Sequence, residues 1–126
     1  REILNNTNIL ANSDEIVSND VFNICITKDG KTFYISTNTT IFKVDRITNE
    51  IIKTYYLEDI AKLQLSVDEN YLYVLTGYNI IQYNLYRINL KEDSTTFELI
   101  LNGNGIILDF FVSRTHIYLG YNEWYI

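Results

Sequence analysis

Apolar residues recur at every second position in short runs along the chain, and a polar break follows each run. Phe22, Ile24 and Ile26 show this period of two, which predicts a β-strand. Lys28-Asp-Gly-Lys31 follows, and Asp-Gly is typical of a two-residue hairpin turn. Further runs predict strands at 32–37, 41–45 and 50–57. We therefore expect residues 20–58 to form an antiparallel meander of four strands.

This pattern repeats 39 residues later without a gap. The shift places Ile26 on Leu65, Asp29 on Asp68, Tyr34 on Tyr73, Ile41 on Ile80 and Val44 on Tyr83. A slip of one residue would exchange the two faces of every strand, so the shared register indicates a true repeat. The second copy predicts strands at 62–67, 71–76, 80–85 and 95–101, with a longer last hairpin through 89–94.

A third copy begins at Ile106, shifted by 45 residues from the second. This shift places Leu65 on Phe110 and Tyr73 on Tyr118. Gly103 and Gly105, interleaved with asparagines, predict the connection that precedes it.

Repeats of 39 to 45 residues with four strands each are typical of β-propeller blades. We expect an all-β chain of consecutive four-stranded meanders, divided into a connection or end of a blade at 1–19, blades at 20–58 and 59–102, and a partial blade at 103–126. Propellers typically use about 4 to 8 blades. We therefore expect this chain to be a piece of a longer propeller, or to be completed by other chains.

Three segments of the first repeat carry a resemblance to a known group. They are Thr27-Lys-Asp-Gly-Lys-Thr-Phe-Tyr-Ile-Ser-Thr-Asn38, Thr40-Ile-Phe-Lys-Val-Asp45 and Thr48-Asn-Glu-Ile-Ile-Lys-Thr54. The pattern resembles WD40 and YVTN-type propeller repeats over about residues 20–126. Val44-Asp45 and Tyr83-Asn84 stand where WD40 repeats carry Trp-Asp, but the Trp and the opening Gly-His are absent. The resemblance implies a propeller fold, and this fold supports many functions.

The net charge of −6 and the pI near 4.6 argue against general nucleic-acid binding, because an acidic surface repels the phosphate backbone. No apolar run approaches the ~20 residues that a membrane helix needs. Cys25 is the only cysteine, and its apolar neighbours predict a small buried core residue. A single reduced cysteine favours the cytoplasm or the nucleus.

The sequence contains few groups suited to catalysis. His116 is the only histidine, and no nucleophile-elbow sequence accompanies it. No His, Cys, Asp and Glu cluster has the spacing of a metal site. We therefore expect no catalytic residue, no bound metal and no cofactor. The adjacent acids Glu58-Asp59 and Glu92-Asp93 read as solvated loop charges.

Two tyrosines lie at predicted junctions between strands and loops. Tyr56 lies where the fourth strand meets its exit loop, and Tyr78 where the second strand meets the third. In a propeller these two connections open on the same face, which commonly binds partners. Together with Glu58, Asp59 and Tyr121, they predict a partner-binding surface.

The sequence therefore favours a non-catalytic protein–protein interaction scaffold in a larger chain or assembly, whose partners are proteins or further blades. Two other readings stay open. One is a propeller enzyme or small-ligand binder whose channel site is completed by other blades. The other is a surface or adhesion protein, since YVTN-like repeats also occur there.

Overall fold

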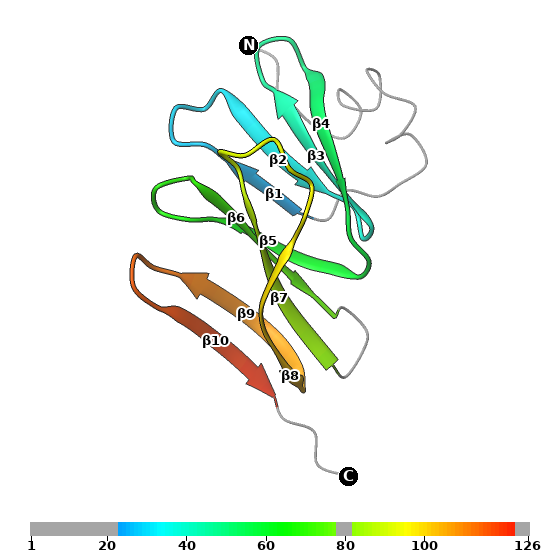
Figure 1. The fold of residues 1–126 in the computed structure, drawn as a ribbon, viewed down its shortest axis with the longest axis vertical. Coiled ribbons are helices and arrows are strands. Elements are labelled where there is room, and N and C mark those ends of the chain that lie inside the picture. Colours follow the sequence, from blue (N-terminus) through cyan, green and yellow to red (C-terminus); the bar gives the residue numbers. More distant parts are fainter. Residues whose placement is uncertain (1–22, 78–81, 123–126) are drawn as a thin grey trace. The chain divides into compact units, whose positions relative to one another are not determined.

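The computed structural model describes residues 23–77 and 82–122, and all of their regular secondary structure is β-strand. Ten strands pair antiparallel into three sheets (Figure 1). The chain divides into unit 1, residues 1–57, and unit 2, residues 58–126. The predicted all-β class is confirmed. None of the described segments is a helix long and apolar enough to cross a membrane.

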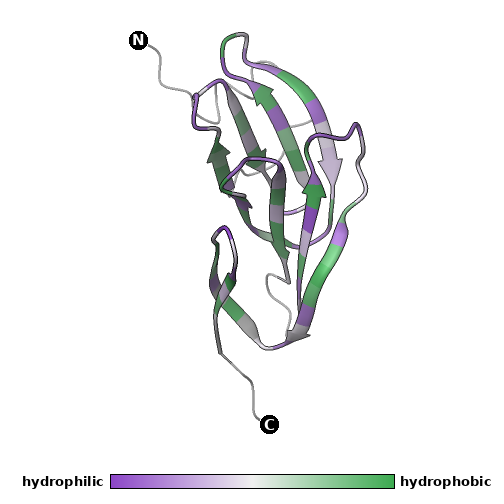
Figure 2. Ribbon diagram, turned by 60° about the vertical axis from the view of Figure 1, so that its left-hand side comes forward, coloured by the Kyte–Doolittle hydropathy of each residue, from purple (hydrophilic) through white to green (hydrophobic). Residues whose placement is uncertain are grey.

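Unit 1 contains one sheet, the first sheet, with strand order β1-β2-β3-β4. Its strands are β1 (Asn23–Ile26), β2 (Thr32–Ser36), β3 (Thr40–Asp45) and β4 (Glu50–Tyr56). Consecutive strands are neighbours, as expected for a meander (Figure 1). Hydrophobic residues lie mostly on the strands, and several of the turns are hydrophilic (Figure 2).

Both faces of the two central strands of the first sheet, β2 and β3, are buried. Phe33, Ile35, Phe42 and Val44 form a buried cluster on one face, because β2 and β3 pair Phe33 with Val44 and Ile35 with Phe42. Residues of the opposite face, Tyr34, Ile41 and Tyr55, are also buried. This is the pattern of a sheet stacked between two layers. Cys25 is half-buried instead of buried, because β1 is the edge strand.

Unit 2 contains a second and a third sheet. The second sheet, in the order β5-β6-β7-β8, consists of β5 (Ile60–Leu65), β6 (Tyr71–Thr76), β7 (Gln82–Asn89) and β8 (Glu98–Asn104). The third sheet consists of β9 (Ile106–Val112) and β10 (Ile117–Asn122).

The third sheet packs on one face of the second. Phe110 and Val112 of β9 belong to one buried cluster with Tyr73, Leu75 and Leu85. The Gln64 side-chain amide donates a hydrogen bond to the Val112 carbonyl oxygen (3.2 Å) and accepts one from the Val112 N–H (3.2 Å). Lys62 and Asp109 form an ion pair at the same contact. In unit 2, the third sheet therefore covers one face of the second sheet.

The β1–β2 connection is a four-residue turn and not the predicted two-residue Asp-Gly turn. Thr27 and Thr32 close it with a backbone hydrogen bond of 3.0 Å. Within the turn, the Thr27 hydroxyl donates to Asp29 Oδ1 (2.7 Å), which also accepts from the Lys31 N–H (2.9 Å). Gly30 adopts φ 72°. The prediction was wrong because the Thr27 and Asp29 side chains satisfy turn N–H groups and so stabilise the wider turn.

The β5–β6 connection repeats this turn 39 residues later. The Ser66 hydroxyl donates to Asp68 Oδ1 (2.7 Å), and that oxygen accepts from the Asn70 N–H (3.0 Å). Ser66 N–H donates to the Tyr71 carbonyl oxygen (2.9 Å). Glu69 takes the place of the glycine at φ 61°. The predicted register of the first two strands therefore agrees with the hydrogen bonds.

The predicted shift of 39 residues between the first and second repeats does not hold beyond β6. β6 and β7 pair Val74 with Tyr86, whereas β2 and β3 pair Ile35 with Phe42. The counterpart of Phe42 is therefore Tyr86, 44 residues later, because the β6–β7 connection is five residues longer. Since five is an odd number, the predicted register assigned the wrong face to every residue of this strand. The strand predicted at 80–85 is β7, Gln82–Asn89.

The counterpart of Val44-Asp45 consequently changes from Tyr83-Asn84 to Ile88-Asn89. The turn hydrogen bonds agree with this assignment. Asp45 Oδ1 accepts from the Ile47 N–H (2.8 Å), and Asn89 Oδ1 accepts from the Lys91 N–H (2.9 Å).

The last predicted strand of the second repeat is also displaced. β8 extends to Asn104, so Gly103 lies inside a strand and not in the predicted connection. The reason is that β7 has eight residues, and its first three pair with Asn102, Gly103 and Asn104.

In the third sheet the predicted 45-residue shift applies to β10 but not to β9. Ser113 closes the β9–β10 turn by accepting from the His116 N–H (3.0 Å), as Ser66 accepts from the Tyr71 N–H (3.1 Å). The turn is two residues shorter, so β9 positions correspond to β5 positions 47 residues earlier. Val112 is thus the counterpart of Leu65, and Tyr118 remains the counterpart of Tyr73.

The turn carboxylates are expected to titrate at low pH. Backbone hydrogen bonds from Lys31 and Asn70, and then hydroxyl hydrogen bonds, lower the pKa of Asp29 and Asp68 below the ordinary value of 3.8. A lowered folded-state pKa stabilises the fold above the unfolded pKa, and this stabilisation is lost as pH falls through the folded pKa. NMR titration of the two carboxyl carbons should give midpoints below 3.8.

The variant Thr27→Val removes one hydroxyl donor and should raise the pKa of Asp29 while leaving Asp68 unchanged. Ser66→Ala is the matched variant for Asp68. A wild-type midpoint at or above 3.8 would contradict the turn geometry.

Candidate functional site

Tyr56 is the one predicted site residue in unit 1. It ends β4, pairs with Thr40 of β3, and is 68% exposed. The next residue, Leu57, donates its N–H to the Thr39 carbonyl oxygen (3.1 Å). The exit of β4 therefore lies beside the β2–β3 turn, as expected for a surface formed by these two connections.

Glu58 and Asp59 open unit 2 as exposed residues ahead of β5. Asp59 adopts φ 55°, and its carbonyl oxygen accepts from the Gly77 N–H (3.0 Å). This bond holds the start of β5 beside the end of β6. Asp59 therefore lies next to the β6–β7 connection, where Tyr78 was predicted to contribute.

The remaining two predicted residues are less defined. Tyr78 lies outside the described residues. Tyr121 is in β10, where its backbone pairs with Ile107 after a register shift, and its side chain is outside the description.

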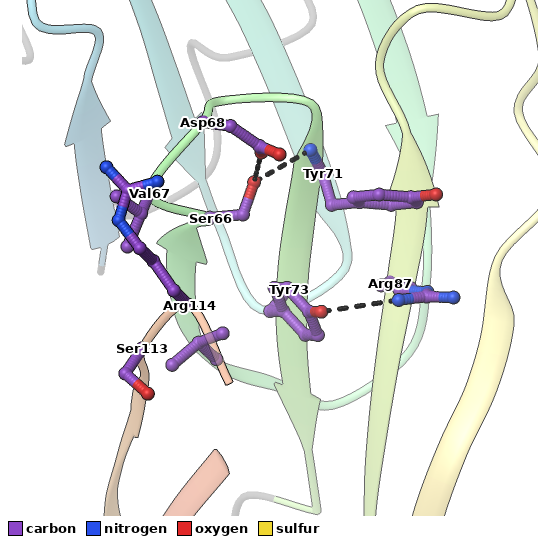
Figure 3. A pocket seen from close by; sticks show the side chains of 9 residues that line it. Ser66, Val67, Asp68, Tyr71, Tyr73, Arg87, Ser113 and Arg114 are labelled. Carbon is purple, nitrogen blue, oxygen red and sulfur yellow. Dashed lines mark hydrogen bonds between the residues drawn. The ribbon is translucent and has the colours of Figure 1, made fainter. Parts of the chain in front are cut away.

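A pocket of about 250 Å³ lies at the opposite end of the second sheet, near the β5–β6 turn. It is lined by Ser66, Val67, Asp68, Tyr71, Tyr73, Arg87, Val112, Ser113 and Arg114 (Figure 3). The residues come from β6, β7, the end of β9 and the β5–β6 and β9–β10 turns. The sequence pattern did not predict this pocket, because it assigned the strand tyrosines to packing.

Arg87 is the most constrained charged group of the pocket. Its Nε donates to Glu98 Oε1 (2.9 Å), its Nη1 donates to the Tyr73 hydroxyl (3.4 Å), and its guanidinium lies 4.4 Å from the Tyr71 ring centroid. The Glu98 hydrogen bond, followed by that of Tyr73, raises the pKa of Arg87. Arg87 therefore keeps its charge at every relevant pH and joins β6, β7 and β8.

The other charged groups do not converge on a ligand position. Asp68 accepts its hydrogen bonds from the turn, and Arg114 extends away from Arg87 (Figure 3). The pocket thus offers a ligand few uncommitted polar groups. The main effect of the Arg87 interactions is to hold β6, β7 and β8 together.

His116 lies in the β9–β10 turn, immediately before β10, and is exposed. Its Nδ1 is 2.7 Å from the Thr115 hydroxyl oxygen. No group of three or more His, Cys, Asp or Glu side chains in residues 23–77 and 82–122 is arranged to hold a metal ion.

Four-stranded antiparallel meanders that follow one another and are buried on both faces define the class of β-propeller blades. No protein-family model and no curated protein matches the sequence. Solved structures do match.

The chain is similar to the β-propeller domain of Myceliophteria thermophila Cps50 (Swd1), at 19% identity and a TM-score of 0.51 over 70% of this chain and 30% of that one. Kuenenia stuttgartiensis hydrazine synthase matches at 18% identity and a TM-score of 0.57, over 70% of this chain and 27% of that one. Kluyvelomyces marxianus Hsv2 matches at 17% identity and a TM-score of 0.53, over 82% of this chain and 31% of that one.

The chain spans about a third of the length of these structures. Identities of 17–19% show the fold alone. The fold of this chain is therefore that of β-propeller blades.

Proposed function

We propose that the chain is a non-catalytic protein-interaction scaffold, and that Tyr56 anchors its partner. The single observation behind the proposal is the 68% exposure of a tyrosine whose backbone is held in place. Pairing with Thr40 and the Leu57–Thr39 hydrogen bond fix this backbone. An exposed aromatic ring on a rigid strand end loses little entropy when a partner covers it.

Tyrosine suits this role because it combines a large apolar ring with a hydroxyl that can donate or accept a hydrogen bond. Tyr, Trp and Arg dominate binding energy in protein interfaces. Glu58 and Asp59 follow Tyr56 in the chain and are exposed, so they favour a partner that presents Lys or Arg nearby. Tyr78 and Tyr121 are the further candidates for this surface.

The test is quantitative capture by the immobilised chain. The Tyr56→Ala variant should retain no more than about one tenth of the partner that the wild type retains. The reason is that a central aromatic anchor contributes about 2 kcal/mol to the binding free energy. Bound proteins are identified and quantified by mass spectrometry. Circular dichroism should show the same β-sheet spectrum for both chains, since the removed ring is exposed.

Ile47→Ala is the matched control, because Ile47 is an exposed apolar residue in the β3–β4 turn, away from the β4 exit. It should retain the partner as well as the wild type. Equal retention by Tyr56→Ala and the wild type, or retention of no protein at all, would show that the proposed surface is wrong.

A further inference from the structure

Two Asn-Gly steps follow one another at the end of β8. They are Asn102-Gly103 and Asn104-Gly105, and they are the only Asn-Gly steps in the sequence. An asparagine followed by glycine is the asparagine step most open to self-reaction. The reason is that glycine has no side chain to hinder the approach of its backbone nitrogen to the asparagine side chain.

The fold holds the two steps differently. Gly103 lies inside the β7–β8 ladder, paired with Tyr83, and an added Cβ on Gly103 would lie 2.6 Å from the Tyr83 hydroxyl oxygen. Asn104 forms the last described pair of that ladder. Gly105 has no partner in the described part of either the β7–β8 or the β9–β10 ladder. The first step is therefore enclosed by strand pairing, whereas the second lies at a strand end, where pairing opens most readily.

The second step also has the freedom and the access that a reaction requires. Asn104 is exposed, and its side-chain amide makes no hydrogen bond with the described residues. Gly105 adopts φ 124°, in the region that favours glycine. Gly105 is itself buried, so solvent reaches this step from the side of Asn104.

We propose that Asn104 is a site of spontaneous deamidation, with water as the co-reactant. The Gly105 amide nitrogen loses its proton and forms a bond to Asn104 Cγ. The bond from Cγ to the side-chain nitrogen breaks, and this nitrogen takes up a proton and leaves as ammonia. Water then opens the cyclic imide at one of its two carbonyl carbons. Both of these carbons belong to Asn104, the exposed residue of the step.

The two products differ in their effect on the fold. Opening the imide at the main-chain carbonyl carbon gives isoaspartate, which lengthens the main chain by a methylene group, and opening at Cγ gives aspartate. Gly105 is the single residue between β8 and β9, so the longer main chain displaces the start of β9. β9 is held on the second sheet by Phe110, Val112 and the hydrogen bonds of Gln64. Isoaspartate should therefore loosen the third sheet, whereas aspartate adds only a negative charge.

The experiment follows the ageing of the folded chain by mass spectrometry of its peptides. Deamidation is detected as the mass increase when the amide –NH2 becomes –OH. Asn104 should deamidate at least about tenfold faster than Asn102, because reaction at Asn102 requires the ladder to open. The rate at Asn104 should rise from neutral to mildly alkaline pH, since the attacking nitrogen reacts without its proton. In concentrated urea the two sites should react at similar rates, because glycine follows both.

Three variants and hydrogen exchange complete the test. Asn104→Gln should stop the reaction at this position, because the longer side chain forms the imide much more slowly. Asn102→Gln is the matched variant and should leave the rate at Asn104 unchanged. The Val112 N–H, which donates to Gln64 Oε1, should exchange faster in the isoaspartate fraction than in the wild type. Freshly prepared Asn104→Asp reproduces the charge alone and should exchange like the wild type.

Three results would overturn the proposal. An Asn104 that stays an amide in the folded chain but deamidates in urea would show that the strand end protects it. Equal rates at Asn102 and Asn104 in the folded chain would show that both react only after the whole sheet opens. Unchanged exchange at Val112 in the isoaspartate fraction would show that the link through Gly105 does not control the third sheet.

Discussion

Replacing Phe42 with alanine is expected to lower the free energy of unfolding of unit 1 by about 3–5 kcal/mol. Phe42 is fully buried in β3, and it packs in a cluster with Phe33, Ile35 and Val44. The truncation removes the transfer free energy of the ring and leaves a cavity that strand-paired neighbours cannot fill. Since small domains are stable by about 5–15 kcal/mol, this change removes a large share of the stability.

Urea denaturation followed by tyrosine fluorescence and circular dichroism would measure the effect. Ile47→Ala provides the control, because its side chain is exposed in a turn and its loss should cost less than about 0.5 kcal/mol. If Phe42→Ala unfolded at the same urea concentration as Ile47→Ala, the buried cluster of the first sheet would be assigned wrongly.

Replacing Gly77 with alanine is expected to destabilise unit 2 by about 3 kcal/mol. Gly77 adopts φ 110°, which side chains rarely tolerate. An added Cβ would lie 2.6 Å from the Gln82 carbonyl oxygen and 3.0 Å from the Tyr83 Cα. Both contacts are with backbone atoms of β7, which cannot rotate away as a side chain would.

Gly120→Ala is the control for this variant, because the nearest atom to an added Cβ there is the Asp109 carbonyl oxygen at 3.9 Å. Gly120 is in a strand, where alanine reduces the entropy of the unfolded chain, so the effect should be within about 1 kcal/mol. Thermal unfolding distinguishes the two variants. Similar melting temperatures for Gly77→Ala and the wild type would contradict the β6–β7 geometry.

The turns show what local sequence can predict. Thr27-Lys-Asp-Gly and Ser66-Val-Asp-Glu carry a hydroxyl, a spacer and a carboxylate at the same spacing, and both form the same hydrogen bonds. All of these interactions lie within six residues of chain. The length of the turn was nevertheless predicted wrongly, because the side-chain hydrogen bonds outweigh the preference of Asp-Gly for a two-residue loop.

The third strand of the second sheet shows where local sequence is insufficient. Residues 80–85 carry an apolar run that matches 41–45, so the pattern predicts a strand without a gap. The observed partner of Val74 is Tyr86 because the whole of β7 pairs in that register. Strand pairing sums many hydrogen bonds and side-chain contacts, and a comparison of apolar runs does not include them.

For the candidate site, the sequence placed Tyr56 at a strand exit, and the structure agrees on its position and its exposure. The sequence could not distinguish Tyr73 from Tyr118, because both follow a turn in the second strand of a repeat. Only the third sheet, which covers one and not the other, makes the first buried and the second exposed.

The sequence alone determined the all-β class, the repeat, the position of the first turn in each of the first two sheets and the acidic charge. Each follows from the alternation of residues or from interactions between near neighbours in the chain. The tertiary structure decided the register of β7, the engagement of Arg87 and the faces that remain exposed. These depend on which strand or sheet lies opposite, and segments distant in sequence supply that neighbour.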